Sequence, residues 1–83
     1  MSDDALIERY IGPNPHRPGV EHAIVEEGDV SVWALVAHWR RVGENVRQVA
    51  ADYDLPTETV KAALAYYRRH AAAIEARIAA NAA

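Results

Sequence analysis

The spacing of apolar residues predicts a helix that begins shortly after residue 30. The residues at i, i+3, i+4 and i+7 of this segment are Val32, Leu35, Val36 and Trp39. This spacing places them on one face of a helix. Ser31 is a suitable N-cap, because its hydroxyl can accept a free amide of the first turn. Gly43 supplies the C-terminal stop.

The segment from Gln48 to Leu64 predicts two short helices joined by a tight turn, the helix-turn-helix arrangement. Val49 and Ala50 face inward from the first helix, and Val60 is the first buried residue of the second. Asn45, with Gln48 three residues later, resembles a capping box that opens the first helix.

The turn between these helices is predicted from four consecutive residues. Asp54 stands where a left-handed residue is often needed, and aspartate tolerates that conformation better than most residues. Leu55 fills the gap between the helices, and Pro56 or Thr57 opens the second one.

Residues 57–83 contain neither glycine nor proline and are rich in alanine. Helix propensity alone predicts one long helix here, with a bend near His70 left open. The residues that continue its apolar stripe are Tyr67, Ala71, Ile74 and Ile78. A trihelical core is too short to cover the far end of this stripe, so the stripe predicts a partner.

The first 29 residues are predicted to be extended rather than helical. Short strands are expected in Leu6–Ile11 and in Ala23–Glu27. Three prolines and two glycines between them, in residues 12–19, predict a loop. We therefore expect a single mainly α domain with three parts: a strand segment for dimerisation (1–29), a helix-turn-helix unit (30–69) and a helical tail (70–83).

Length and charge limit the class of protein. Eighty-three residues form one domain with a small core, and the chain has no cysteine to reinforce it, so we expect a homodimer or higher oligomer. Ile24, Val25 and Trp33 are the predicted dimerisation residues. No apolar run approaches the ~20 residues that span a bilayer, and the N-terminus lacks a signal-peptide pattern, so a cytoplasmic protein is expected.

The formal net charge is −3, but it is unevenly distributed. Residues 1–29 carry seven acidic and two basic side chains, for −5, whereas residues 30–83 carry five acidic and seven basic ones, for +2. This asymmetry permits contact between the helical part and DNA without requiring it.

The second helix of the motif supplies the candidate DNA-binding residues, namely Thr57, Glu58, Lys61 and Arg68. In a major groove, Lys61 can bond guanine acceptors and Glu58 can accept from cytosine. Ala62 and Ala65 are expected on the same face, where they offer nothing that reads a base. The alternative for each residue is an ordinary solvated face.

Catalytic and metal-binding patterns are not found. The four histidines (His16, His22, His38 and His70) share no ligand spacing, and there is no phosphate-binding loop or nucleophile motif. We expect no enzyme, no cofactor and no metal. His38 is interpreted as a satisfied surface histidine, and Asp52 and Asp54 as caps for backbone amides at the turn.

The predicted partner-binding residues are Tyr67, Ile74, Arg77 and Ile78. They suit a helix that lies in an apolar groove of a partner, with Arg77 available to pair with acidic groups. The alternative is a tail that packs across its own dimer.

The order and spacing of several segments resemble a known family. They are Val30–Val36, Asp52-Tyr53, Val60–Tyr67, His70 and Ile74. Over roughly residues 20–80 they resemble the antitoxin-like domain of unknown function family number four hundred thirty-three. One departure is clear: Glu21–Asp29 stands where members commonly have Gly-Gly-Lys-Pro followed by Arg-Gly-Thr.

The resemblance implies a VapB-type antitoxin with N-terminal strands and a homeodomain-like trihelical unit. It also implies a homodimer, an operator in duplex DNA and a PIN-like nuclease toxin as partner, with no membrane association. Two functions are therefore expected as alternatives. One is a DNA-binding antitoxin that neutralises the nuclease and represses its own promoter; the other is a dimeric protein-interaction module that does not bind DNA.

Overall fold

The N-terminal segment begins with a helix, which corrects the prediction of extended structure there. The structure is a computed structural model that describes residues 2–82. Helix α1 spans Asp3–Tyr10, and the Ser2 hydroxyl caps it by accepting the Ala5 amide at 3.2 Å. Two acidic residues in the first turn favour the helix because they face its positive end. The β-forming residues near position 10 therefore did not determine the conformation of this segment. The Ser2 cap and the burial of Leu6 on the inner face of the helix determined it.

A small antiparallel sheet follows α1. Its strands are β1 (Ile11–Gly12), β2 (Ile24–Val25) and β3 (Val30–Ser31), in the order β1-β2-β3. Short 3-10 turns, η1 (Val20–His22) and η2 (Glu27–Asp29), precede β2 and β3. The predicted strand in residues 23–27 is confirmed at Ile24–Val25, whereas the first predicted strand is reduced to its last residue and Gly12.

Three helices form the expected trihelical unit, which confirms the mainly α fold. They are α2 (Val32–Arg41), α3 (Val46–Tyr53) and α4 (Thr57–Arg69). Asn45 caps α3 as predicted, because its side chain accepts the Gln48 amide at 3.0 Å. Ser31 occupies the N-cap position of α2 but makes no side-chain capping bond, so this part of the prediction is wrong.

The turn between α3 and α4 has the predicted geometry. Asp54 is left-handed, with φ 55° and ψ 50°, and ends α3. The Leu55 amide then bonds the Ala50 carbonyl at 2.9 Å, and Leu55 packs against the core. The short turn therefore holds α3 and α4 at a fixed crossing.

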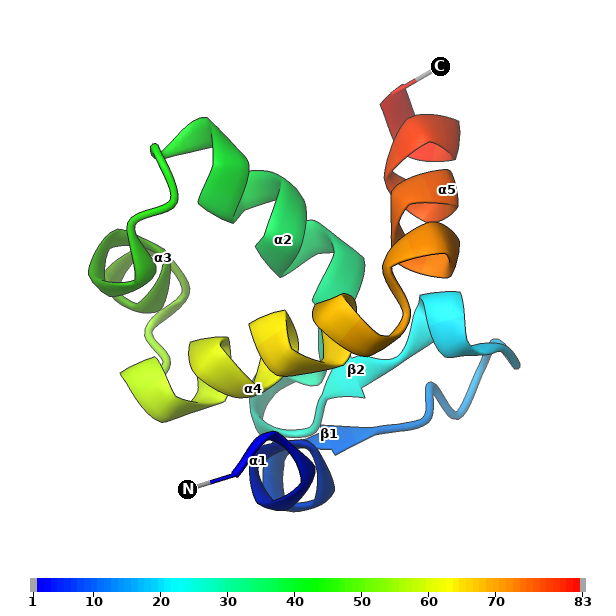
Figure 1. Ribbon diagram of the computed structural model, residues 1–83, viewed down its shortest axis with the longest axis horizontal. Coiled ribbons are helices and arrows are strands. Elements are labelled where there is room, and N and C mark those ends of the chain that lie inside the picture. Colours follow the sequence, from blue (N-terminus) through cyan, green and yellow to red (C-terminus); the bar gives the residue numbers. More distant parts are fainter. Residues whose placement is uncertain (1, 83) are drawn as a thin grey trace.

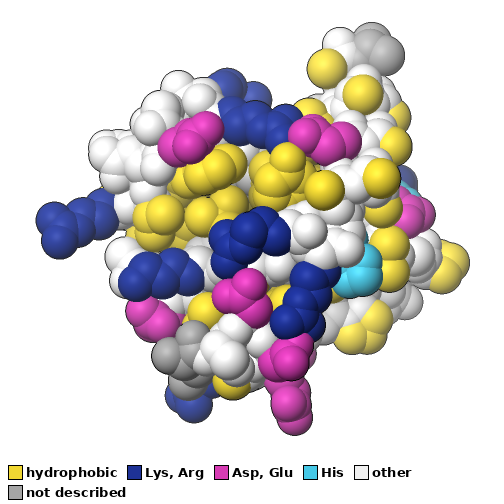
Figure 2. Space-filling model, in the orientation of Figure 1, with side chains coloured by type: hydrophobic (Ala, Val, Ile, Leu, Met, Phe, Trp, Pro, Cys, Tyr) yellow, Lys and Arg dark blue, Asp and Glu magenta, His cyan; other side chains and the backbone are white. Residues whose placement is uncertain are grey.

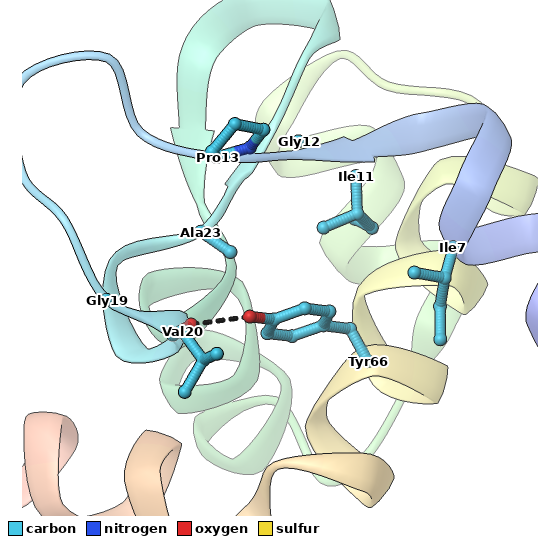
Figure 3. Close-up of a pocket in the computed structure, with 8 residues that line it drawn as sticks. All are labelled: Ile7, Ile11, Gly12, Pro13, Gly19, Val20, Ala23 and Tyr66. Atoms are coloured by element: carbon cyan, nitrogen blue, oxygen red, sulfur yellow. Dashed lines mark hydrogen bonds between the residues drawn. The ribbon is translucent and has the colours of Figure 1, made fainter.

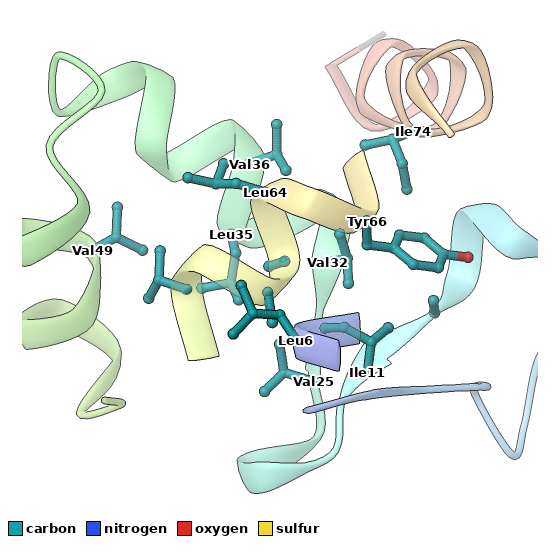
Figure 4. Packing of buried hydrophobic residues seen from close by; sticks show 14 of the residues in the cluster. Leu6, Ile11, Val25, Val32, Leu35, Val36, Val49, Leu64, Tyr66 and Ile74 are labelled. Carbon is teal, nitrogen blue, oxygen red and sulfur yellow. The ribbon is translucent and has the colours of Figure 1, made fainter. Parts of the chain in front are cut away.

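Helix α4 runs through the middle of the molecule (Figure 1). α2 and α3 pack on one side of it, and α1 lies across another side, in the most extensive contact between any two elements. The core around α4 includes Leu6 of α1, Val25 of β2, Leu35 of α2 and Val49 of α3 (Figure 4). The five helices and the three strands thus contribute to one continuous core with α4 at its centre.

The chain turns sharply at His70, which has φ −127° and ψ 38°, and a separate helix α5 (Ala71–Ala82) follows. The prediction of one long helix is therefore replaced by two helices. Ile74 of α5 has no exposed surface and belongs to the core, so the expectation that it lies outside the domain's core is wrong (Figure 4). Ile78 also packs against the core but stays partly exposed. Ala83, at the end of the predicted tail, lies outside the described residues.

Within residues 2–82, no helix is both long enough and apolar enough to cross a membrane.

The burial of Ile74 gives a stability prediction. Ile74→Ala should lower the free energy of unfolding by about 2–5 kcal/mol, because a large side chain is deleted from a closed core. Urea denaturation followed by circular dichroism measures this. The partly exposed Ile78→Ala is the matched control and should cost less. An Ile74→Ala variant as stable as the wild type would mean that α5 is not docked.

Candidate functional site

The face of α4 that was predicted to read DNA is narrow. Thr57, Glu58, Lys61 and Arg68 are exposed as expected, and Arg69 joins them. Ala62 and Ala65 have no exposed surface, so their placement on a groove-facing surface is wrong.

Helix α1 covers Ala62 and Ala65. Arg69 lies four residues after Ala65 and seven after Ala62, so the three share one face of α4. The Arg69 guanidinium pairs with Asp4 of α1, which shows that α1 occupies this face. A duplex approaching α4 would meet α1 on this flank.

The cations of the exposed strip are paired with acids of the same chain. Lys61 lies 3.3 Å from Glu58, and Arg68 donates to both carboxylate oxygens of Asp3 at 3.2 Å. Figure 2 shows basic and acidic side chains interleaved around an apolar area on this face. The strip therefore has little net positive charge to attract phosphates.

A second surface is a groove between α2 and the end of α5, with a cavity of about 270 Å³. Trp33, Ala37 and Arg41 line it from α2, and Ile78 and Asn81 from α5. Trp33 and Ile78 give it apolar surface, whereas Arg41, Asn81 and Tyr53 of α3 give it polar groups. The groove thus combines a concave shape with both apolar and polar surface.

Cations surround this groove. The Arg77 guanidinium stacks on the Trp33 ring, 4.4 Å from the ring centre, a cation–π contact. Among residues 2–82, neither Arg77 nor Arg41 has an acidic side chain within ion-pair distance. The groove therefore combines the apolar side chains of Trp33 and Ile78 with polar surface, and its two arginines are free to meet an acidic surface, unlike the arginines of α4.

A polar network fixes α5 relative to the trihelical unit and so sets the shape of the groove. Arg40 of α2 donates to Glu75 of α5 at 2.6 Å and to the Tyr67 hydroxyl at 2.7 Å. The Tyr67 hydroxyl donates to the same Glu75 oxygen at 2.8 Å. The bond from Arg40, helped by that from Tyr67, lowers the pKa of Glu75 below its usual 4.5. Tyr67 is thus occupied within the chain, which limits its predicted role in partner binding.

His38 and Asp52 connect α2 with α3. His38 Nε2 lies 2.6 Å from Asp52, whose other oxygen accepts from Gln48 at 2.7 Å. The hydrogen bond with His38 is the main reason why the pKa of Asp52 lies below its usual value. His38 is thus satisfied as predicted, whereas Asp52 binds side chains rather than capping the turn. Within residues 2–82, no three His, Asp or Glu side chains are grouped to hold a metal ion.

The structure brings some predicted site residues together and separates others. Trp33, Arg77 and Ile78 meet at the α2–α5 groove, although Trp33 was predicted from a different feature. Ile24 and Val25 are buried in the chain itself, so they cannot supply the predicted dimer interface without rearrangement. Homodimerisation itself stays a prediction. Of the three predicted interface residues, Trp33 is the one that remains accessible.

Sequence reasoning missed Arg41 as a groove residue and Tyr66 as a core residue. Arg41 was not predicted to line a groove, because α5 was not expected to fold back beside α2. Tyr66, rather than Tyr67, is the buried tyrosine of α4. The signal for Tyr66 was present: it lies four and seven residues after Ala62 and Thr59, both buried on the α1 side.

The fold and these surfaces define a small mainly α protein built on a helix-turn-helix unit, with a short antiparallel sheet beside it. Residues 22–67 match the model of a family described as "Protein of unknown function (DUF433)". The match covers more than half of the chain, so the protein belongs to this family, as the sequence resemblance predicted. No curated protein matches the chain. No solved structure matches it either.

The Glu75 network gives a prediction for the pH dependence of stability. Because the folded-state pKa of Glu75 is depressed, its contribution is present above about pH 4.5 and is lost as the pH falls through the folded-state value. Glu75→Gln should therefore be less stable than the wild type at pH 7, and the gap should narrow below pH 4.5. Urea denaturation of both proteins from pH 3 to 7 measures this. A gap independent of pH would exclude the ionised pair as its source.

Proposed function

We propose that this protein is an antitoxin-like regulator that acts by binding a partner protein through the α2–α5 groove. The observation that carries the proposal is the pair Arg77 and Arg41 at a groove that also contains the Trp33 ring, without acidic partners among the described residues. The family resemblance implies a PIN-like nuclease as the partner. Carboxylates that hold the metal of such a nuclease are a suitable counterpart for a guanidinium.

The charge distribution supports this surface over α4. Each basic residue that α4 exposes is paired with an acid of its own chain. Separating such pairs to contact a partner would sacrifice existing interactions, whereas Arg77 and Arg41 have no carboxylate pairs among residues 2–82 to lose. Trp33 adds a large, partly exposed ring, and tryptophan and arginine are the residues that most often dominate binding energy at interfaces.

Charge reversal at the groove tests the proposal. Arg77→Glu should weaken binding to a PIN-like nuclease, the partner that the family resemblance implies, by at least about tenfold, because attraction is replaced by repulsion. Arg77→Lys keeps the charge and should retain most of the affinity. Titration calorimetry measures the affinity, and inhibition of nuclease activity gives a second readout.

Arg17→Glu is the matched control, since Arg17 is an exposed arginine on the loop after β1, away from the groove. It should bind as the wild type does. Equal binding by Arg77→Glu and Arg17→Glu would exclude the groove, and no binding by the wild type would exclude this nuclease as the partner. Thermal unfolding of each variant separates lost contacts from lost folding.

A second candidate function is operator binding by α4. It is favoured by Thr57, Glu58, Lys61 and Arg68, which follow one exposed edge of the second helix of a helix-turn-helix unit. Asp3 and Asp4 lie beside this edge and would repel the phosphates of an approaching duplex. Binding would therefore require these two side chains to move away from Arg68 and Arg69.

Substitution of the exposed cations tests this second function. Lys61→Ala and Arg68→Ala should each weaken binding to duplex DNA from the chain's own upstream region by about 1–3 kcal/mol if the residue contacts DNA. Fluorescence anisotropy at several salt concentrations measures it, with Arg9→Ala as a control on α1. Unchanged affinity in both variants would exclude α4 as the reading helix.

A further inference from the structure

A separate cavity of about 380 Å³ lies on the side of the molecule formed by α1, β1 and η1 (Figure 3). Ile7 of α1, Ile11 of β1, Val20 of η1 and the adjacent Ala23 line it, and the Tyr66 ring of α4 forms a further wall. The Tyr66 hydroxyl donates to the Val20 carbonyl at 2.7 Å, so this polar group is already satisfied. The cavity therefore presents almost entirely apolar surface.

The cavity is open to solvent and its rim is stiff. Val20 leaves 45% of its surface exposed beside it. The rim also includes Pro13 and Gly19, at the two ends of a loop that contains three prolines. Proline restricts the backbone, so the rim loses little entropy when a ligand binds. Gly19 has φ 116°, a conformation that favours glycine, and a Cβ there would overlap the Glu21 carboxylate.

Two acidic side chains, Glu21 and Glu26, lie beside residues that line the opening. Glu21 is close enough to the cavity wall that it adds to burial in raising the pKa of Tyr66. The Glu21 carboxylate lies 3.6 Å from His22 Nε2, and the Glu26 side chain lies against Gly12, which lines the cavity. Residues 1–29 as a whole carry −5. An apolar cavity in an acidic surface is complementary to an apolar side chain next to a cation.

We infer that this cavity receives a branched apolar side chain from a partner protein, with a neighbouring lysine or arginine that pairs with Glu21. The cavity volume of about 380 Å³ has room for one leucine or isoleucine side chain together with neighbouring parts of the partner's chain. This site is distinct from the α2–α5 groove, which presents cations instead of acids. A protein that engages both surfaces would need a basic segment for one and an acidic segment for the other.

Selection from a random peptide library displayed on phage, against the immobilised full chain, tests the inference. Selected peptides should share an isoleucine, leucine or valine beside a lysine or arginine. Val20→Glu should reduce their affinity by about tenfold or more, because it puts a charge at an apolar contact. Glu21→Lys should reduce it by about fivefold through the lost ion pair. Chemical shifts in the NMR spectrum should change at Ile7, Ile11 and Tyr66.

Two comparisons keep the test decisive. Arg77→Glu, which alters the α2–α5 groove, should leave these peptides bound as tightly as the wild type does. Thermal unfolding shows whether Val20→Glu stays folded, and Glu21→Lys, a surface substitution, provides a second variant. Selected peptides without a basic residue, peptides that bind both variants unchanged, or no enrichment over the Val20→Glu protein would each overturn the inference. Failure of the nuclease to bind the groove would leave it unaffected.

Discussion

The enclosure of α4 is the constraint on which the rest of this structure depends. α2 and α3 pack on one flank, α1 lies on another, and the central part of α4 is buried except along one edge. Alanines at 62, 63 and 65 make this possible, since their small side chains let neighbouring elements approach closely. A domain of 83 residues has little core to spare, and placing one helix at its centre gives every other element a surface to cover.

The same enclosure determines which surfaces remain for function. A helix surrounded by its own chain presents only a strip, and acids from α1 and α4 already balance the cations along that strip. Concave surfaces lie instead on the periphery of the described chain. One is between α2 and α5 and carries arginines, and another is between α1 and η1 and has acidic side chains beside its opening. Their opposite charges make them suited to different ligands.

Local signals in the sequence predicted the trihelical unit well. The apolar spacing of α2, the asparagine cap of α3 and the left-handed aspartate each act within a few residues, so each is readable without knowledge of the fold. The errors involve contacts between distant segments. Nothing near Ala62 indicates that α1 returns to cover it, and nothing near Ile74 indicates that α5 folds back onto the core. α1 itself was missed because isoleucine and tyrosine at its end outweighed Ser2, whose capping role was not considered.

The shortness of the strands has a consequence for how this protein meets other chains. Each strand pairs through two residues, and the outer strands β1 and β3 offer only a few free main-chain groups. Such an edge is a poor template for another strand, so the sheet resists extension into aggregates. Recognition must then rest on side chains, whose identity can change one residue at a time while the backbone stays the same. Relatives with this fold can therefore acquire different partners without a new architecture.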